Sequence, residues 1–137
     1  MSFLYFYPYQ RVNYTRFANV KTDYRLADNQ IEIIESMSDL ENFEKKVNQT
    51  ETKYSEAFFD RNVLLAAIRN GSYYAQSKVT KVRIGENEAE LTYAVENDQN
   101  IVGSGNVEGV FFIDLIEVAK SKIKTSDLKV TYIDKVM

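Results

Sequence analysis

Acidic side chains are the residues of this chain whose chemistry could support catalysis, because the sequence contains no histidine and no cysteine. Without histidine no side chain has an unperturbed pKa near neutral pH, and without cysteine there is no thiolate nucleophile. Asp114 and Glu117 interrupt the most apolar segment, residues 110–118. In a strand, strict alternation places these two residues on opposite faces, so they form a working pair only if a bulge intervenes. A hydrolase that uses acids alone, with Asp114 or Glu117 in its site, is one open alternative.

A glycine-containing loop and a lysine cluster are the other features that could bind or activate a substrate. In the loop at residues 103–109, a dinucleotide fingerprint would need its third glycine where Glu108 stands. Ser104 lies between two glycines, but it lacks the spacing of a nucleophile elbow and a histidine base. The lysines between residues 120 and 124 are typical of a charged turn that discourages edge pairing. We therefore expect no catalytic residue, no cofactor and no metal site.

Aromatic residues supply most of the potential contact surface, with ten tyrosines and eight phenylalanines. From Phe3 to Tyr9 the pattern has a two-residue period, which places a tyrosine row on one face of a strand. Pro8 cannot donate a ladder hydrogen bond, so this strand lies at a sheet edge or ends there. Such rings form either an exposed contact surface or ordinary cross-strand and core pairs. The residues that we expect to form an interaction surface are Tyr5, Tyr7, Tyr9, Tyr73 and Tyr74.

Length and charge limit the class of protein. We expect one domain, residues 1–137, in which an extended aromatic segment at 1–30 packs on a β-rich core at 31–137. The net charge of −3 disfavours a nucleic-acid partner, which normally requires a basic face. The apolar start at residues 1–9 is far shorter than the ~20 residues that span a bilayer, so we expect no transmembrane segment. The absence of cysteine fits a reducing cytosol and a secreted protein equally well, and does not locate the chain.

Hydrophobic periodicity predicts two short helices. Leu40, Phe43 and Val47 follow helical spacing after a capping-box motif that begins at Ser38, which predicts a helix over about 39–48. A second helical turn is expected at about 55–60, where Ser55 could serve as a hydroxyl cap.

The remaining pattern predicts strands. Residues 63–68 are an almost unbroken apolar run, typical of a strand covered on both faces. Residues 110–119 fit either a helix face or a strand, and their β-branched and aromatic content favours a central strand. Together these patterns predict a mostly β fold of the α+β class, an antiparallel β-sandwich or roll with one or two short helices. Further strands are expected at residues 31–34, 73–84, 89–95 and 128–132.

The aromatic pair Phe58-Phe59, the strand that follows at Asn62, the Gly71-Ser72 turn and the later strand at 113–120 carry a resemblance to known proteins. In these features the chain resembles small, largely clostridial β-rich proteins. They are loosely related to the PrcB-type C-terminal domain of protease-complex-stabilising proteins. The resemblance covers about residues 31–137. It implies a non-catalytic accessory or binding domain, often exported or surface-anchored, and it provides no catalytic residue to carry over.

The hypothesis that these observations favour is a non-catalytic accessory domain that binds a protein partner or a second copy of itself. It predicts an exposed aromatic patch or a self-complementary edge. A carbohydrate- or peptide-binding module that uses surface tyrosines is an alternative, and it predicts a concave, tyrosine-lined pocket. The acid-only hydrolase predicts two carboxyl groups about 5–10 Å apart in one cleft.

Overall fold

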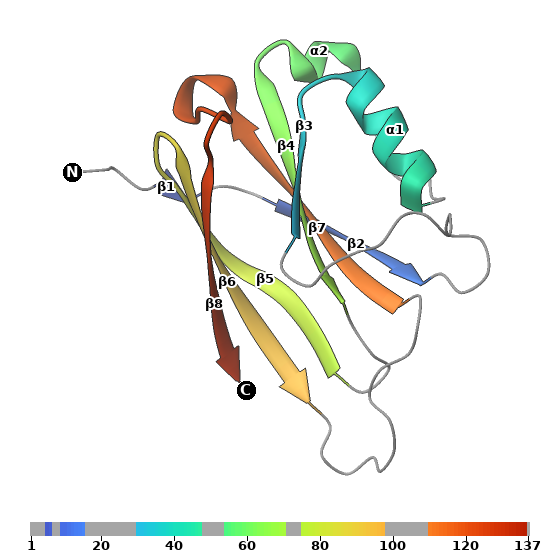
Figure 1. Ribbon diagram of the computed structural model, residues 1–137, viewed down its shortest axis with the longest axis vertical. Coiled ribbons are helices and arrows are strands. Elements are labelled where there is room, and N and C mark those ends of the chain that lie inside the picture. Colours follow the sequence, from blue (N-terminus) through green and yellow to red (C-terminus); the bar gives the residue numbers. More distant parts are fainter. Residues whose placement is uncertain are drawn as a thin grey trace.

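The chain folds into two β-sheets that pack face to face, with a layer of short helices on the outside of one sheet (Figure 1). The computed structural model describes residues 5–6, 9–15, 30–47, 54–70, 75–97 and 110–136. The mostly β sandwich with short helices that the sequence predicts is therefore confirmed.

Within the part of the chain that the structure describes, each sheet has four strands. The first, called here the β5–β6 sheet, has the order β1 (Tyr5–Phe6), β5 (Ala75–Ile84), β6 (Glu88–Asn97) and β8 (Lys129–Val136). The second, called the β4–β7 sheet, has the order β2 (Tyr9–Thr15), β7 (Val110–Ala119), β4 (Asn62–Asn70) and β3 (Gln30–Ile34). The helical elements are α1 (Met37–Val47), α2 (Glu56–Phe59) and a 3₁₀ turn, η1 (Lys120–Lys122).

The pairing departs from the expected antiparallel arrangement at one place. All described strand pairs are antiparallel except β6–β8, which runs parallel from Glu88 opposite Lys129 to Val95 opposite Val136. A parallel pair cannot be joined by a tight turn and needs a crossover. Here the chain leaves β6, passes through β7 in the other sheet and returns as β8.

Strand β4 lies at the centre of the hydrophobic packing because both of its faces are buried. Val63, Leu65 and Ala67 belong to the core between the sheets, whereas Leu64 and Ile68 belong to the core under the helices. Residues 63–68 are each at most 2% exposed, which confirms the strand covered on both sides that the sequence predicts. Segment 110–119 is strand β7, paired with β4 on one side and β2 on the other, so the strand interpretation was right.

Helix α1 covers the outer face of the β4–β7 sheet with Leu40, Phe43 and Val47. It begins two residues earlier than predicted, and its capping residue is Ser36 rather than Ser38. Ser36 Oγ accepts a hydrogen bond from the backbone N–H of Asp39 at 3.1 Å. Asp39 Oδ2 in turn accepts one from the N–H of Glu35 at 3.0 Å, which is close to a capping box.

The second helix is shorter than predicted, and its hydroxyl cap is not made. Ser55 occupies the N-cap position of α2 in an extended conformation, but its side chain forms no capping hydrogen bond. Packing holds this turn instead, because Phe59 is buried in the core under the helices and Phe58 packs against that core.

The N-terminal aromatic segment forms two strands rather than the single strand expected. β1 pairs with β5, and β2 pairs with β7, so the two strands belong to different sheets. Among the described residues, each is one of the two outermost strands of its sheet; β1 ends at Phe6 and β2 begins at Tyr9. The edge position that the sequence predicts agrees with this arrangement, and Pro8 itself lies outside the described residues.

Candidate functional site

The aromatic residues predicted to form a contact surface are only partly visible. Tyr5 lies opposite Ile84 in β1, and Tyr9 lies opposite Ile116 in β2. The Tyr9 side chain is half-buried and packs against the core between the sheets. Tyr7, Tyr73 and Tyr74 lie outside the described residues. The described backbone therefore places this segment at sheet edges.

No tyrosine whose side chain the structure describes is exposed. Tyr93 is 1% exposed, while Tyr9, Tyr54 and Tyr132 are half-buried. Tyr9, Tyr93 and Tyr132 all contribute to the core between the sheets. These rings therefore form ordinary cross-strand and core pairs rather than an exposed contact surface, which is one of the two alternatives that the sequence leaves open.

Asp114 and Glu117 lie on opposite faces of β7, as alternation predicts. Asp114 is fully buried between the sheets, where one carboxylate oxygen accepts a hydrogen bond from the backbone N–H of Val79 at 3.4 Å. Glu117 faces the helices and accepts a hydrogen bond from the Tyr54 hydroxyl at 2.8 Å. Because a sheet separates them, the two carboxylates cannot act on one substrate as the pair that glycoside hydrolysis uses.

The Tyr54–Glu117 hydrogen bond belongs to an aromatic cluster beside α2. The Tyr54 ring lies 4.6 Å from the Phe58 ring between centroids, and Phe58 meets Phe59 edge to face at 5.0 Å. Burial, followed by the hydrogen bond to Glu117 and its negative charge, raises the pKa of Tyr54 well above its ordinary value. The shift favours the neutral phenol, which donates to Glu117 and so connects the segment that leads into α2 with β7.

An arginine that is not among the residues predicted from the sequence connects the two sheets. Arg69, at the end of β4, is 5% exposed, and its guanidinium lies 2.6 Å from a carboxylate oxygen of Asp134 in β8. The same guanidinium stacks over the Tyr93 ring at 3.9 Å from its centroid. Tyr93 stacks in turn on Tyr132, with centroids 6.5 Å apart. We call these residues the Arg69 cluster: Arg69, Tyr93, Tyr132 and Asp134.

The Arg69 cluster is suited to holding structure and is poorly suited to proton transfer. An arginine remains protonated at any pH that a protein tolerates, and it stacks well on aromatic faces. It joins β4 in one sheet to β6 and β8 in the other. One feature of the sequence could have identified Arg69, because it directly follows the apolar run 63–68. A charged residue at the end of a buried strand requires a partner.

Among the described side chains, the outer face of the β5–β6 sheet is charged rather than aromatic. Alternation turns Thr92 and Ala94 of β6 outward, since Ala89, Leu91 and Tyr93 face the core between the sheets. Register places cations on both sides of this central strand. The outward charged residues with described side chains are Lys78, Lys81, Arg83, Glu88, Glu90, Lys129 and Lys135.

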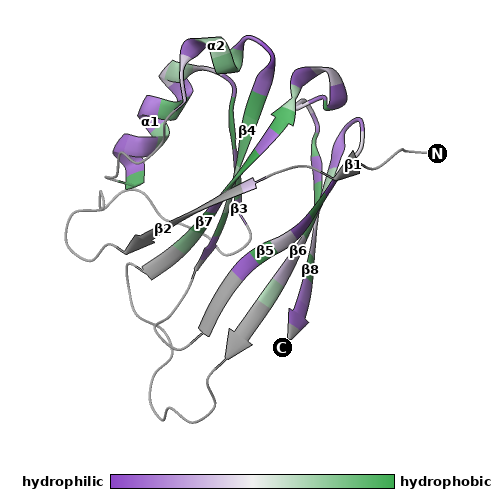
Figure 2. Cartoon of the chain, turned by 180° about the vertical axis from the view of Figure 1, so that it is seen from behind, coloured by the Kyte–Doolittle hydropathy of each residue, from purple (hydrophilic) through white to green (hydrophobic). Residues whose placement is uncertain are grey.

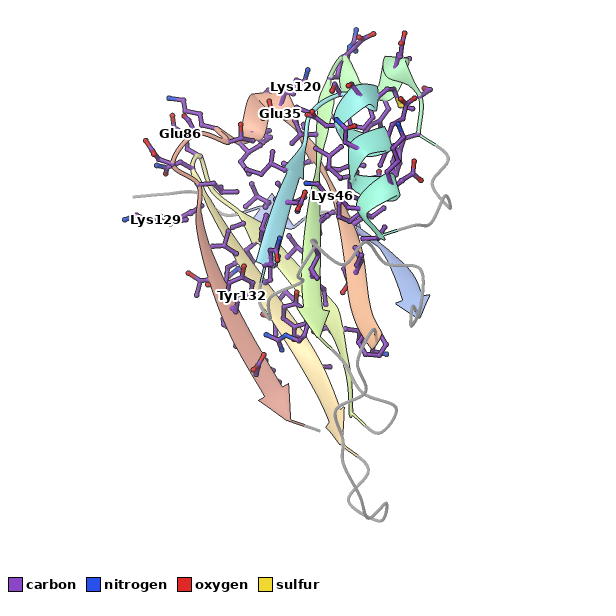
Figure 3. The ribbon with its side chains drawn as sticks, turned by 45° about the vertical axis from the view of Figure 1, so that its right-hand side comes forward. Glu35, Lys46, Glu86, Lys120, Lys129 and Tyr132 are labelled. Atoms are coloured by element: carbon purple, nitrogen blue, oxygen red, sulfur yellow. The ribbon has the colours of Figure 1, made fainter. Side chains whose placement is uncertain are left out.

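Turn residues at one end of this sheet continue the charged surface. The Lys124 ammonium lies 2.7 Å from a carboxylate oxygen of Glu86, and this contact lowers the pKa of Glu86 and raises that of Lys124. Figure 3 shows Glu86 and Lys129 at this end, away from the helices, whereas Glu35 and Lys46 lie by the helical layer. Both members of the Glu86–Lys124 pair are exposed, so the pair contributes little to stability.

Two further properties concern metals and membranes. Within the described ranges, no group of three or more acidic side chains is placed so that it could hold a metal ion. None of the helices in that part of the chain has the length and hydrophobicity that a membrane span requires.

Comparisons with family models, curated proteins and solved structures give no match for this chain.

Proposed function

We propose that this chain is a non-catalytic accessory domain that binds a protein partner along the edge formed by β1 and β2. The observation that carries the proposal is the position of these strands, which end their sheets among the described residues on the side opposite to β8 and β3. The outer side of an edge strand carries a row of backbone N–H and C=O groups that an added strand can pair with. The partner is either another protein or a second copy of the chain.

The geometry supports this proposal better than the two alternatives. A carbohydrate- or peptide-binding module would need exposed tyrosines in a concave site, and no tyrosine with a described side chain is exposed. An acid-only hydrolase would need two carboxylates in one cleft, and Asp114 and Glu117 lie on opposite faces of β7. In strand addition the main-chain hydrogen bonds give affinity and side chains of the edge give specificity, so it is compatible with an edge at which Tyr9 is half-buried against the core between the sheets.

The test compares partner capture by the wild type with capture by edge variants, using extract from the native host. Val12→Pro and Asn13→Pro change neighbouring residues of β2, whose N–H groups point to opposite sides of the strand. One proline breaks a hydrogen bond to β7 and destabilises the fold, whereas the other removes only an outward donor and blocks strand addition. The thermal midpoint of each variant identifies which of them keeps the wild-type fold.

We expect the stable proline variant and a Tyr5/Tyr7/Tyr9→Ser variant to lose a partner that the wild type captures. If the partner is a second copy, the same variants change the molar mass measured by light scattering. Tyr132→Ser is the matched control, because it removes a tyrosine from the inner face of β8, away from the β1–β2 edge. An unchanged partner set in the stable edge variants, or a wild type that is monomeric and captures nothing, would contradict the proposal.

A further inference from the structure

The outer face of the β5–β6 sheet carries a regular arrangement of cations around small residues. Across the three strands, Lys78 and Lys135 flank Ala94 in one row, and Lys81 and Ile133 flank Thr92 in the next. A bulge in β5 maintains this arrangement, since the register shifts between Val79 and Lys81 and keeps the lysines turned outward. Both lysines of β5 and Lys135 of β8 are exposed.

The lysines form the accessible surface above the middle of β6. Neighbouring strands lie ~4.8 Å apart, so the Cα atoms of Lys78 and Lys135 lie ~10 Å apart on either side of Ala94. Ala94 and Thr92 are short side chains, only 8% and 4% exposed, so neighbouring side chains cover them. A segment placed along β6 would lie above these residues, with Lys78 and Lys81 on one side and Lys135 on the other.

Among the described side chains, the charge of this face is opposite in sign to that of the whole chain. Its described side chains include Lys78, Lys81, Arg83, Lys129 and Lys135 as cations, against the acids Glu88 and Glu90. The chain as a whole has a net charge of −3. Figure 2 shows hydrophilic residues along β8 and the described part of β5, whereas β4 is mainly hydrophobic. A basic face on an acidic protein favours a negatively charged ligand at this face.

We propose that the outer face of the β5–β6 sheet binds an extended acidic segment of a protein partner, which lies along β6 with its carboxylates between the lysine rows. The inference deepens the proposed protein-binding function by naming the chemistry of a partner. It concerns a different surface from the β1–β2 edge, so an experiment can contradict either of the two proposals without contradicting the other.

An acidic protein segment fits this face better than a nucleic acid does. Glu88 and Glu90 lie on the same face at the start of β6 and repel any negative charge placed beside them. A protein segment can place uncharged residues there and its carboxylates beside the lysines, whereas a phosphate backbone carries a charge at every nucleotide. Arg83 is the arginine among the described outward side chains. Its guanidinium lies 3.6 Å from a carboxylate oxygen of Glu90, so it forms an ion pair within the face. No aromatic ring with a described side chain lies on this face to stack against a base.

The probe is a fluorescently labelled peptide of alternating glutamate and serine, as long as the ten-residue strand β6. Fluorescence anisotropy measures its Kd for the wild type, for Lys78→Glu/Lys135→Glu, and for Lys45→Glu/Lys120→Glu. The last variant is the matched control, because it makes the same change in charge on α1 and η1 rather than on this face. We expect the face variant to bind at least about tenfold more weakly and the control to change less than about threefold.

Two further probes decide between classes of ligand. Raising the salt concentration shortens the Debye length from ~10 Å at 0.1 M to ~3 Å at 1 M, so binding of the glutamate peptide should weaken strongly. Single-stranded DNA of equal charge should bind more weakly than the peptide, and tighter DNA binding would overturn the proposal. Equal losses in the face and control variants would overturn it too, because they indicate attraction without a site.

The stable β2 proline variant separates this proposal from the proposed function. It should bind the glutamate peptide as the wild type does, since the edge and the face share no residue. A wild type that does not bind the peptide overturns this inference and leaves strand addition at the edge to its own test.

Discussion

The two sheets of this protein differ in how they are covered. Within the described residues the β4–β7 sheet is buried on both sides, by the other sheet and by the helices, whereas the β5–β6 sheet is covered on one side. The strand sequences agree with this difference in burial. Residues 63–68 of β4 are all apolar, whereas β6 alternates apolar residues with polar or small ones. A strand that is buried on both faces has no position for an exposed polar side chain. A strand that is buried on one face can carry charged side chains on the other.

The largest effect should come from the sheet that is covered on both sides. Leu64 is fully buried on the helix-facing side of β4, and Leu64→Ala should lower the free energy of unfolding by about 2–5 kcal/mol. The matched change on the open face, Ile133→Ala in the half-buried outer row of β8, should lower it by about 1 kcal/mol. Urea denaturation measures both values, and equal losses would show that the two sheets are covered alike.

The next effect concerns the contact between the sheets. Arg69→Ala removes the stack on Tyr93 and the ion pair with Asp134, and should lower the free energy of unfolding by about 2 kcal/mol. Most of this loss comes from the buried arginine, because the Asp134 side chain is 53% exposed and its charge is screened by solvent. Arg69→Met keeps an apolar stem in the same place and should lose less.

A surface ion pair provides the control for Arg69. The Lys46 ammonium lies 3.6 Å from a carboxylate oxygen of Glu32, and the lysine side chain is 45% exposed. Glu32→Gln should change the free energy of unfolding by less than about 0.5 kcal/mol. If Arg69→Ala has an effect as small as this, the Arg69 cluster does not stabilise the packing of the two sheets.

A smaller effect tests the helical layer that distinguishes the β4–β7 sheet. Ser36→Ala removes the acceptor for the N–H of Asp39 and should lower the free energy of unfolding by about 1 kcal/mol. Ser38→Ala, at the residue that the sequence pattern indicates as the cap, should change it by less than about 0.5 kcal/mol. The reverse order in urea denaturation would place the start of α1 two residues later.

The smallest effect near neutral pH concerns Tyr54, at the edge of the same layer. Its folded pKa is raised above the ordinary value of 10.0, so the neutral phenol is favoured in the folded state. The corresponding stability is fully present below pH 10.0 and is lost as the pH rises above it towards the folded pKa. Urea denaturation on either side of this pH should show a fall in stability that Tyr54→Phe reduces.

Glu117→Gln separates the causes of that shift. Because burial is its largest cause, the pKa of Tyr54 should move towards 10.0 in this variant but remain above it. Difference absorbance of tyrosinate between the variants with and without Tyr54 gives the midpoint. A pKa that returns fully to the ordinary value would show that Glu117 alone, and not burial, produces the shift.

The elements of the fold that depend on local pattern could be predicted from the sequence. The continuous apolar run identified β4, and β-branched content correctly favoured a strand for residues 110–119. The start of α1 could not be decided in this way, since Ser36-x-x-Asp39 and Ser38-x-x-Glu41 both fit a cap. The earlier start prevails in the fold, where Met37 packs against the core under the helices.

Features that depend on distant residues could not be predicted. The parallel β6–β8 pair requires knowledge of the crossover through β7, and no sequence pattern of either strand encodes its partner. Arg69 meets Asp134 across 65 positions, and Tyr54 meets Glu117 across 63. Alternation alone did place Asp114 and Glu117 on opposite faces, because that relation is local to one strand.

The passage of the N-terminal segment from one sheet to the other has a mechanical consequence. β1 ends at Phe6 and β2 begins at Tyr9, so three Cα steps, ~11 Å at most, connect sheets that pack ~10 Å apart. Three Cα steps cannot extend beyond this limit, so tension applied to β2 reaches β1. Under such a load we expect β1, held by two paired residues, to detach from β5 before the seven-residue strand β2 detaches from β7.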